Sequence, residues 1–268
     1  MAIDSHCHLD DDAFVPDRDA VIARAQALGV RGIVVPAYRA DCFDRLRDCC
    51  ARPSLLSLWP AYGLHPCYVA AHEAEHVSRL EDLLATTDAV AVGEIGLDRH
   101  AEDLRHPGLW RRQQDLLAAQ LQLAQSYDLP VILHARSAYA ELISMLRRHR
   151  PCAGVVHAFN GRLEQAYAFL DLGLVLGVGG VITQPSAQRL RDILRRLPQD
   201  AWVLESDAPD MLPYEVYRVG GRRNEPSFLA YNIAALAQTL ERSPVWVAQQ
   251  AEQTTRRILR LPALDASE

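Results

Sequence analysis

The first residues that could do chemistry are two histidines one residue apart, His6 and His8, in the opening segment 2–10. Side chains alternate between the two faces of a β-strand, so both imidazoles are expected to point the same way. Imidazole is a common metal ligand, and such a pair can hold one ion between its rings. Because the chain has 10 histidines, a close pair by itself is weak support for a metal site.

Four later side chains strengthen this interpretation, because each follows a short apolar run of the kind that forms a buried strand: Glu94, His134, His157 and Asp207. Parallel strands of a barrel bring their carboxyl ends to one rim, where barrel active sites lie. Six metal-competent side chains at that rim suffice for two divalent ions, which Glu94 could bridge or ligate. Any one of the six could be a buried polar group with hydrogen-bond partners, but all six at strand ends favour a metal centre.

Short apolar runs alternate with amphipathic segments along the whole chain. The runs predict strands over residues 2–6, 32–36, 57–63, 89–94, 130–134, 153–157, 173–178 and 201–206. The segments predict helices over 15–28, 40–51, 76–86, 111–127, 138–149, 162–172, 186–196, 226–241 and 244–260. This alternation indicates parallel pairing through crossover helices, and runs that are apolar on both faces suit strands buried on both sides.

We therefore predict an α/β fold, a single-domain (β/α)8 TIM barrel over residues 1–268, with an amidohydrolase-like metal site at its C-terminal rim. A doubly wound open sheet is the alternative. The glycine-rich dinucleotide loop that often follows the first strand of such a sheet is missing from the sequence.

The composition is that of an ordinary globular chain, with 49% hydrophobic and 23% charged residues. No apolar run is long enough to cross a membrane and the first residues have no leader pattern, so we expect a cytoplasmic protein without a membrane partner. Six cysteines without a C-x-x-C spacing are interpreted as free thiols, with Cys7 as a packing residue.

All 28 basic residues are arginines. The absence of lysine excludes a Schiff base, a lysine general base and a carboxylated lysine between two metals. The net charge is −6 and both signs are spread along the chain, so a broad positive face for duplex nucleic acid is not expected. A nucleic acid would be held locally, through metal and a few arginines such as Arg222 and Arg223 after the last strand.

Eight motifs occur in order along nearly the whole chain: D-S-H-C-H-L-D, G-L-H-P, V-G-E-I-G-L-D, P-V-I-L-H-A-R, H-A-F-N-G, L-G-V-G-G-V-I-T, E-S-D-A-P and R-N-E-P. With these motifs the chain resembles the TatD-type metal-dependent hydrolases. The resemblance implies a metal-dependent deoxyribonuclease, since some members are 3′ to 5′ exonucleases, while some relatives remove D-amino acids from mischarged tRNA. It also implies the ligand set that strand position suggested: His6, His8, Glu94, His134, His157 and Asp207.

The chain departs from the family pattern at a few positions. Arg99 replaces the usual aromatic residue after Gly-Leu-Asp, and Ser137 replaces the usual aspartate after His-x-Arg. The segment 253–259 lacks the asparagine and phenylalanine of the family pattern. None of these is a candidate ligand, so metal binding is expected to survive, while the two changes on rim loops bear on substrate choice.

The roles of the candidates follow from their position and from the resemblance together. Two divalent ions about 3.5–4 Å apart can activate water and stabilise both oxygens of an in-line displacement. Asp207 is the predicted general base as well as a ligand, and Glu94 is the second predicted catalytic residue. His65 and Arg136 are predicted to bind a substrate phosphate, although His65 could instead cap its loop. Glu205 shares a face with Asp207 and is predicted to orient a ligand histidine.

Our first functional hypothesis is hydrolysis of phosphodiester bonds in single-stranded DNA or frayed ends, because a barrel mouth on an acidic protein admits one strand more readily than a duplex. The alternative is a deacylase of aminoacyl-tRNA or a hydrolase of a small ester or amide. A non-catalytic metal-binding protein is a third hypothesis, which the complete ligand set disfavours. Histidines with carboxylates suit Zn²⁺ or Mn²⁺ and nuclease chemistry often uses Mg²⁺, so the two divalent ions are left open among these three.

Overall fold

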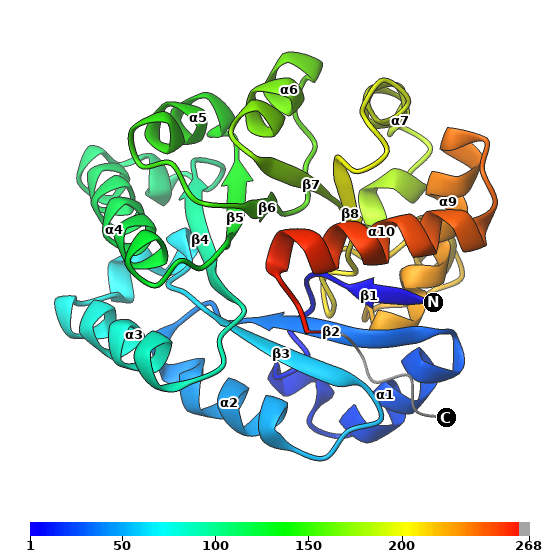
Figure 1. Cartoon of the computed structure of the whole chain (residues 1–268), viewed down its shortest axis with the longest axis horizontal. Coiled ribbons are helices and arrows are strands. Elements are labelled where there is room, and N and C mark those ends of the chain that lie inside the picture. The colour runs from blue at the N-terminus through cyan, green and yellow to red at the C-terminus, as the bar shows by residue number, and fades with distance from the viewer. Residues whose placement is uncertain (263–268) are drawn as a thin grey trace.

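The computed structural model describes residues 1–262, and its eight strands form one parallel sheet in the order β1 to β8 (Figure 1). Every strand pairs with the next one along the chain, as a (β/α)8 barrel requires. Two backbone hydrogen bonds join the carboxyl ends of β8 and β1 and the residues just after them, from Ser5 N–H to Leu204 O at 3.0 Å and from Asp207 N–H to His6 O at 2.9 Å. The predicted TIM barrel is therefore confirmed.

The strands are β1 (Ala2–Asp4), β2 (Val30–Pro36), β3 (Ser57–Tyr62), β4 (Ala91–Asp98), β5 (Val131–Arg136), β6 (Gly154–Val156), β7 (Leu174–Val178) and β8 (Trp202–Leu204). The helices are α1 (Arg18–Ala27), α2 (Phe43–Ala51), α3 (Ala74–Thr86), α4 (Pro107–Ser126), α5 (Tyr139–Arg148), α6 (Leu163–Asp171), α7 (Gln188–Leu194), α8 (Tyr214–Arg218), α9 (Leu229–Leu240) and α10 (Pro244–Leu259). All predicted elements are present. The short helix α8 was not predicted, and β4 runs further than the expected 89–94.

Strand side chains fill two apolar layers, as alternation dictates. Ile132 of β5 and Val203 of β8 belong to the inner cluster, which Ile258 and Leu259 of α10 join. Helix α10 crosses one end of the barrel, and its last turns carry Arg257, which donates to the Asp200 carbonyl just before β8 (Figure 1). That end is the amino-terminal end of the strands, so the opposite end is left for a site.

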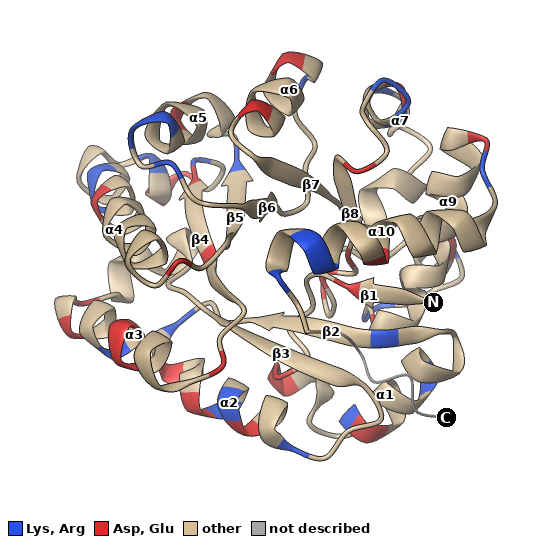
Figure 2. Ribbon diagram, viewed as in Figure 1, with Lys and Arg blue, Asp and Glu red and all other residues tan. Residues whose placement is uncertain are grey.

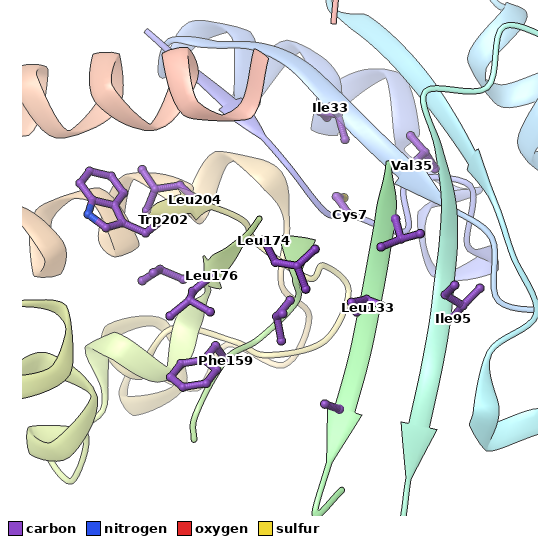
Figure 3. Close-up of a cluster of buried hydrophobic side chains, with 14 of the residues drawn as sticks. Cys7, Ile33, Val35, Ile95, Leu133, Phe159, Leu174, Leu176, Trp202 and Leu204 are labelled. Carbon is purple, nitrogen blue, oxygen red and sulfur yellow. The ribbon is translucent and has the colours of Figure 1, made fainter. Parts of the chain in front are cut away.

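The outer layer packs between the strands and the surrounding helices. Figure 3 shows part of it, including Cys7, Ile33 of β2, Ile95 of β4 and Leu133 of β5. The Cys7 side chain is fully buried and its thiol contacts the Ala208 carbonyl oxygen at 3.6 Å. Cys7 thus packs in the core.

Arginines and acidic residues are interspersed around the outer helices (Figure 2). Within residues 1–262 no helix is long and apolar enough to cross a membrane. The loop after β8 is tied down by such charges, since Arg223 donates to Asp17 Oδ1 at 2.7 Å and Oδ2 at 2.8 Å. Arg223 therefore helps to hold the loop after β8 against the loop that precedes α1.

Candidate metal centre

A cavity of about 1140 Å³ opens at the carboxyl ends of the strands. The predicted site residues that line it are His8, His65, Glu94, His134, Arg136, His157 and Asp207. His6 and Glu205 are fully buried beside these residues. The barrel thus brings side chains from β1, β3, β4, β5, β6 and β8 to one place.

The two histidines after β1 converge for a reason other than strand alternation. Strand β1 ends at Asp4, so the predicted strand 2–6 is too long, and both histidines lie in the segment that follows. Two backbone hydrogen bonds hold that segment in place, from Cys7 N–H to Val34 O at 3.1 Å and from His8 N–H to Ala208 O at 2.9 Å. The Nε2 atoms of His6 and His8 lie 3.3 Å apart as a result.

A register shift between Val92 and Ile95 positions Glu94. Ala91 packs in the inner apolar cluster, so strict alternation from Ala91 would direct Glu94 outward. The irregularity re-aims the side chain, as bulges near active sites commonly do. The Glu94 carboxylate consequently lies in the middle of the cluster.

Glu94 has a different group of residues at each of its two oxygens. Oε2 lies 3.2 Å from His6 Nε2 and 3.6 Å from His8 Nε2. Oε1 lies 3.1 Å from His65 Nε2 and 3.0 Å from His134 Nδ1. The Glu94 carboxylate thus lies between two groups of imidazole rings.

Asp207 completes the first of these groups. Its Oδ1 lies 3.5 Å from His6 Nε2 and 3.7 Å from His8 Nε2, and its Oδ2 lies 3.5 Å from His157 Nε2. On the other side of the His157 ring, Glu205 Oε1 lies 3.1 Å from Nδ1 and accepts a hydrogen bond from Ala158 N–H. Glu205 is thus placed where a residue that orients His157 would be.

The charges of the site depend on one another. Burial alone would raise the pKa of Glu94, but His65 and His6 outweigh it and hold that pKa well below its ordinary value. Burial also acts to lower the pKa of His157, yet Glu205 and Asp207 raise it well above the ordinary value. Glu94 is therefore ionised, and His157 carries a proton between Glu205 and Asp207 when the ion is absent.

The donor set fits a divalent cation. His8 Nδ1 donates to the Pro36 carbonyl oxygen at 3.0 Å, so in the neutral ring Nε2 presents a lone pair to His6, Glu94 and Asp207. Histidine nitrogens and carboxylate oxygens at such spacings are suitable ligands for Zn²⁺ or Mn²⁺. One ligand atom each from His6, His8 and Asp207 lies within 4.8 Å of the others.

His65 has a more specific state than the sequence indicated. Its Nδ1 accepts a hydrogen bond from Cys67 N–H at 3.1 Å, so Nε2 carries the proton and donates to Glu94. Burial lowers the pKa of His65 to about 4, so the ring is neutral near pH 7. His65 both caps its loop, the alternative noted from the sequence, and faces the cavity.

Sequence reasoning missed three residues at this rim. Asp98 ends β4 with Oδ2 2.9 Å from His134 Nε2, and its alternation with Glu94 along β4 was the available signal. Gln113 and Gln120 on α4 are buried, and the sequence analysis of this helix did not single them out. Gln113 bonds both the N–H and the carbonyl of Asp98, and Gln120 does the same for Leu64. These glutamines fix the segments that carry Asp98 and His65.

We expect Gln120→Ala to destabilise the protein by about 2–4 kcal/mol, because it leaves two buried backbone groups without partners and opens a small cavity. Urea unfolding measures the difference. Gln122→Ala is the matched control, since Gln122 is exposed on the same helix. A Gln120→Ala protein as stable as this control would show that the hydrogen bonds between Gln120 and the Leu64 backbone do not contribute to stability.

The fold and the site together define a class of protein, the barrel hydrolases with a metal centre at the carboxyl ends of the strands. The family described as TatD related DNase matches residues 3–260, and the chain belongs to this family. It is a metal-dependent hydrolase family, as the names of its members state.

The chain is similar to named relatives over nearly its full length. It is 41% identical to the "Uncharacterized metal-dependent hydrolase YjjV" of Escherichia coli, covering 97% of this chain and 98% of the relative. It is 33% identical to the "3'-5' ssDNA/RNA exonuclease TatD" of Yersinia pseudotuberculosis, covering 92% and 95%. The crystal structure of the E. coli YjjV protein superposes with a TM-score of 0.89 at 39% identity over 97% of this chain and 98% of that one.

Proposed function

We propose that the chain hydrolyses phosphodiester bonds at the 3′ ends of single-stranded or frayed DNA. The observation that carries this proposal is a set of arginines at the cavity wall. Arg136, Arg162 and Arg189 line the cavity, and none of them has a carboxylate partner among residues 1–262. On a chain of net charge −6, unpaired guanidinium groups around a metal centre favour a polyanionic substrate.

An aromatic group that lines the same cavity, made by Tyr38 and Tyr68, supports a nucleotide substrate. The rings of Tyr38 and Tyr68 lie 5.4 Å apart, and the Arg39 guanidinium lies 5.1 Å from the Tyr68 ring. Tyrosine and arginine side chains of this kind stack on bases irrespective of sequence. The relative named 3'-5' ssDNA/RNA exonuclease is consistent with this substrate class.

The residues of this chain would then divide the work. Two divalent ions held by His6, His8, Glu94, His134, His157 and Asp207 would polarise the phosphate and bring the pKa of water near neutrality. Asp207 accepts the proton of the attacking water at a carboxylate oxygen. Arg136 binds a non-bridging phosphate oxygen, while His65 donates its Nε2 proton to Glu94 and holds that carboxylate in place beside the substrate.

Hydrolysis of end-labelled single-stranded DNA tests the proposal. Metal-stripped protein is resupplied with Mg²⁺, Mn²⁺ or Zn²⁺, and stepwise shortening from the 3′ end is expected with at least one ion. Release of amino acid from aminoacyl-tRNA, with no shortening of DNA or RNA under any ion, would replace the nuclease assignment with the deacylase.

Arg136→Ala should raise KM for single-stranded DNA by about 10-fold, since a charge-assisted hydrogen bond to phosphate is lost. In a plot of the logarithm of the binding constant against the logarithm of salt concentration, the slope should become less steep by about 0.7. This is the value for one phosphate contact on a single strand. Arg148→Ala is the control, because Arg148 is exposed at the far end of α5. An unchanged salt slope in Arg136→Ala would remove Arg136 from the substrate contacts.

A further inference from the structure

The charged side chains around the main cavity are sorted by sign. Arg136 ends β5, Arg162 immediately precedes α6 and Arg189 lies on α7, so three successive strand and helix units each supply one arginine. Beyond the metal centre, the acidic side chains that line the cavity are Asp11 and Asp210, which follow β1 and β8. The cavity wall is thus positive in one sector of the barrel and negative in another.

A second cavity continues the positive sector. It has a volume of about 520 Å³, shares Arg162 and Arg189 with the main cavity and adds Arg196, which follows α7. Helix α7 runs back from the rim toward the start of β8, so Arg196 lies further from the metal centre than Arg189 does. Because two arginines belong to both cavities, the cavities adjoin and form one path that leads away from the metal centre.

The arginines along this path can bind a ligand. Arg162, Arg189 and Arg196 are exposed, and none of them forms an ion pair with a carboxylate among residues 1–262. Arg189 donates to the Asn160 carbonyl oxygen at 3.0 Å, which holds its guanidinium beside the cavity. A guanidinium has five N–H donors, so this bond leaves others for a phosphate oxygen.

The acidic side chains of the second cavity offset its positive charge only in part. Asp192 forms an ion pair with Arg195 at 2.6 Å, which compensates its charge. Glu164, exposed in the first turn of α6, is the other carboxylate that lines this cavity. Helix α6 begins at Leu163, where the two cavities meet, and the positive end of its dipole adds to the field of the arginines. The second cavity therefore favours an anion.

We propose that a single strand of DNA leaves the metal centre across Arg162 and Arg189 and continues over Arg196, so that this chain prefers strands several phosphates long to mono- or dinucleotides. Each guanidinium binds one phosphate of the strand. The strand does not leave past Asp11 and Asp210, because like charges repel a polyanion there. The inference rests on the proposed function and adds to it the path and the length of the substrate.

Steady-state hydrolysis of a dinucleotide and of a strand of about ten nucleotides tests the length preference. The ratio of kcat/KM for the strand to kcat/KM for the dinucleotide should fall about 5-fold in Arg196→Ala, because the dinucleotide is too short to reach that contact. Arg162→Ala combined with Arg189→Ala should weaken binding of the strand further. Arg148→Ala is the matched control, since it removes the same charge at the far end of α5 and should leave the ratio unchanged.

Fluorescence anisotropy measures binding without hydrolysis. The same strand is used with a phosphorothioate backbone, which resists cleavage. Arg196→Ala should weaken its binding about 5-fold and make the dependence on salt less steep by about 0.7, the value for one phosphate contact on a single strand. Arg148→Ala should bind as the wild type does.

The two measurements separate the path from the proposed function. Hydrolysis of DNA by the wild type, with the same length ratio in Arg196→Ala and Arg148→Ala, would overturn the path and leave the proposed function standing. Absence of hydrolysis with every ion would overturn the proposed function, and the anisotropy then decides: weaker binding by Arg196→Ala than by Arg148→Ala supports the path, and equal binding overturns it. The substituted arginines are exposed, so matching circular dichroism spectra confirm that the variants fold.

Discussion

Glu94→Gln is expected to reduce kcat by about 10³-fold, comparable to the loss of a preorganised charge in an active site. The substitution preserves the shape of the side chain and removes the charge that lies between the two groups of histidines. Its Oε2 faces His6 at 3.2 Å and its Oε1 faces His134 at 3.0 Å. A glutamine there also turns an N–H₂ group toward one of the two groups of histidines, so the bound metal per chain should fall as well if ions lie there as proposed.

Elemental analysis after dialysis, together with steady-state kinetics on single-stranded DNA, measures both effects. Glu102→Gln is the matched control, because Glu102 is exposed in the loop after β4 and makes no contact with the centre. A Glu94→Gln protein that keeps the full metal content and turns over within a factor of about three of the control would show that Glu94 does not lie between two ions.

The positions of most site residues could be predicted because apolar runs mark barrel strands. His134 and His157 each follow such a run, and the closure of the barrel then determines that they meet. This convergence could be predicted without any distance, because parallel barrel strands end at one rim however far apart they lie in the sequence. The six predicted ligands do converge, as the contacts of Glu94 and Asp207 with the four histidines describe.

The direction in which individual side chains point was harder to predict from the sequence. Glu94 enters the cavity only because β4 changes register between Val92 and Ile95, a feature that depends on pairing with β5. Asp98 was missed because β4 was expected to end at Glu94. Gln120 was missed because no local pattern reveals that its amide binds the backbone of Leu64. Pairing across strands and polar contacts inside the core are tertiary properties that no local pattern encodes.

Asp207→Asn should lower kcat by about 10³-fold, through loss of the proton acceptor that general base catalysis requires. The backbone of Asp207 is left-handed, with a φ of 55°, and asparagine accepts this conformation better than most residues. The variant should therefore fold normally, which thermal unfolding checks. Burial acts to raise the pKa of Asp207, but His157 and His6 hold it below its ordinary value, so the wild-type carboxylate is ready to accept a proton at neutral pH.

Metal dependence separates the two roles proposed for Asp207. If it were only a ligand, saturating metal would restore kcat in Asp207→Asn, because weaker binding is overcome by concentration. If Asp207 is the general base, the kcat of Asp207→Asn stays low at every metal concentration. Asp210→Asn is the control, since Asp210 lines the same cavity and is exposed. Full recovery of Asp207→Asn at high Mn²⁺ would assign the base to another group, and among the neighbouring carboxylates Glu94 would then be the one to test.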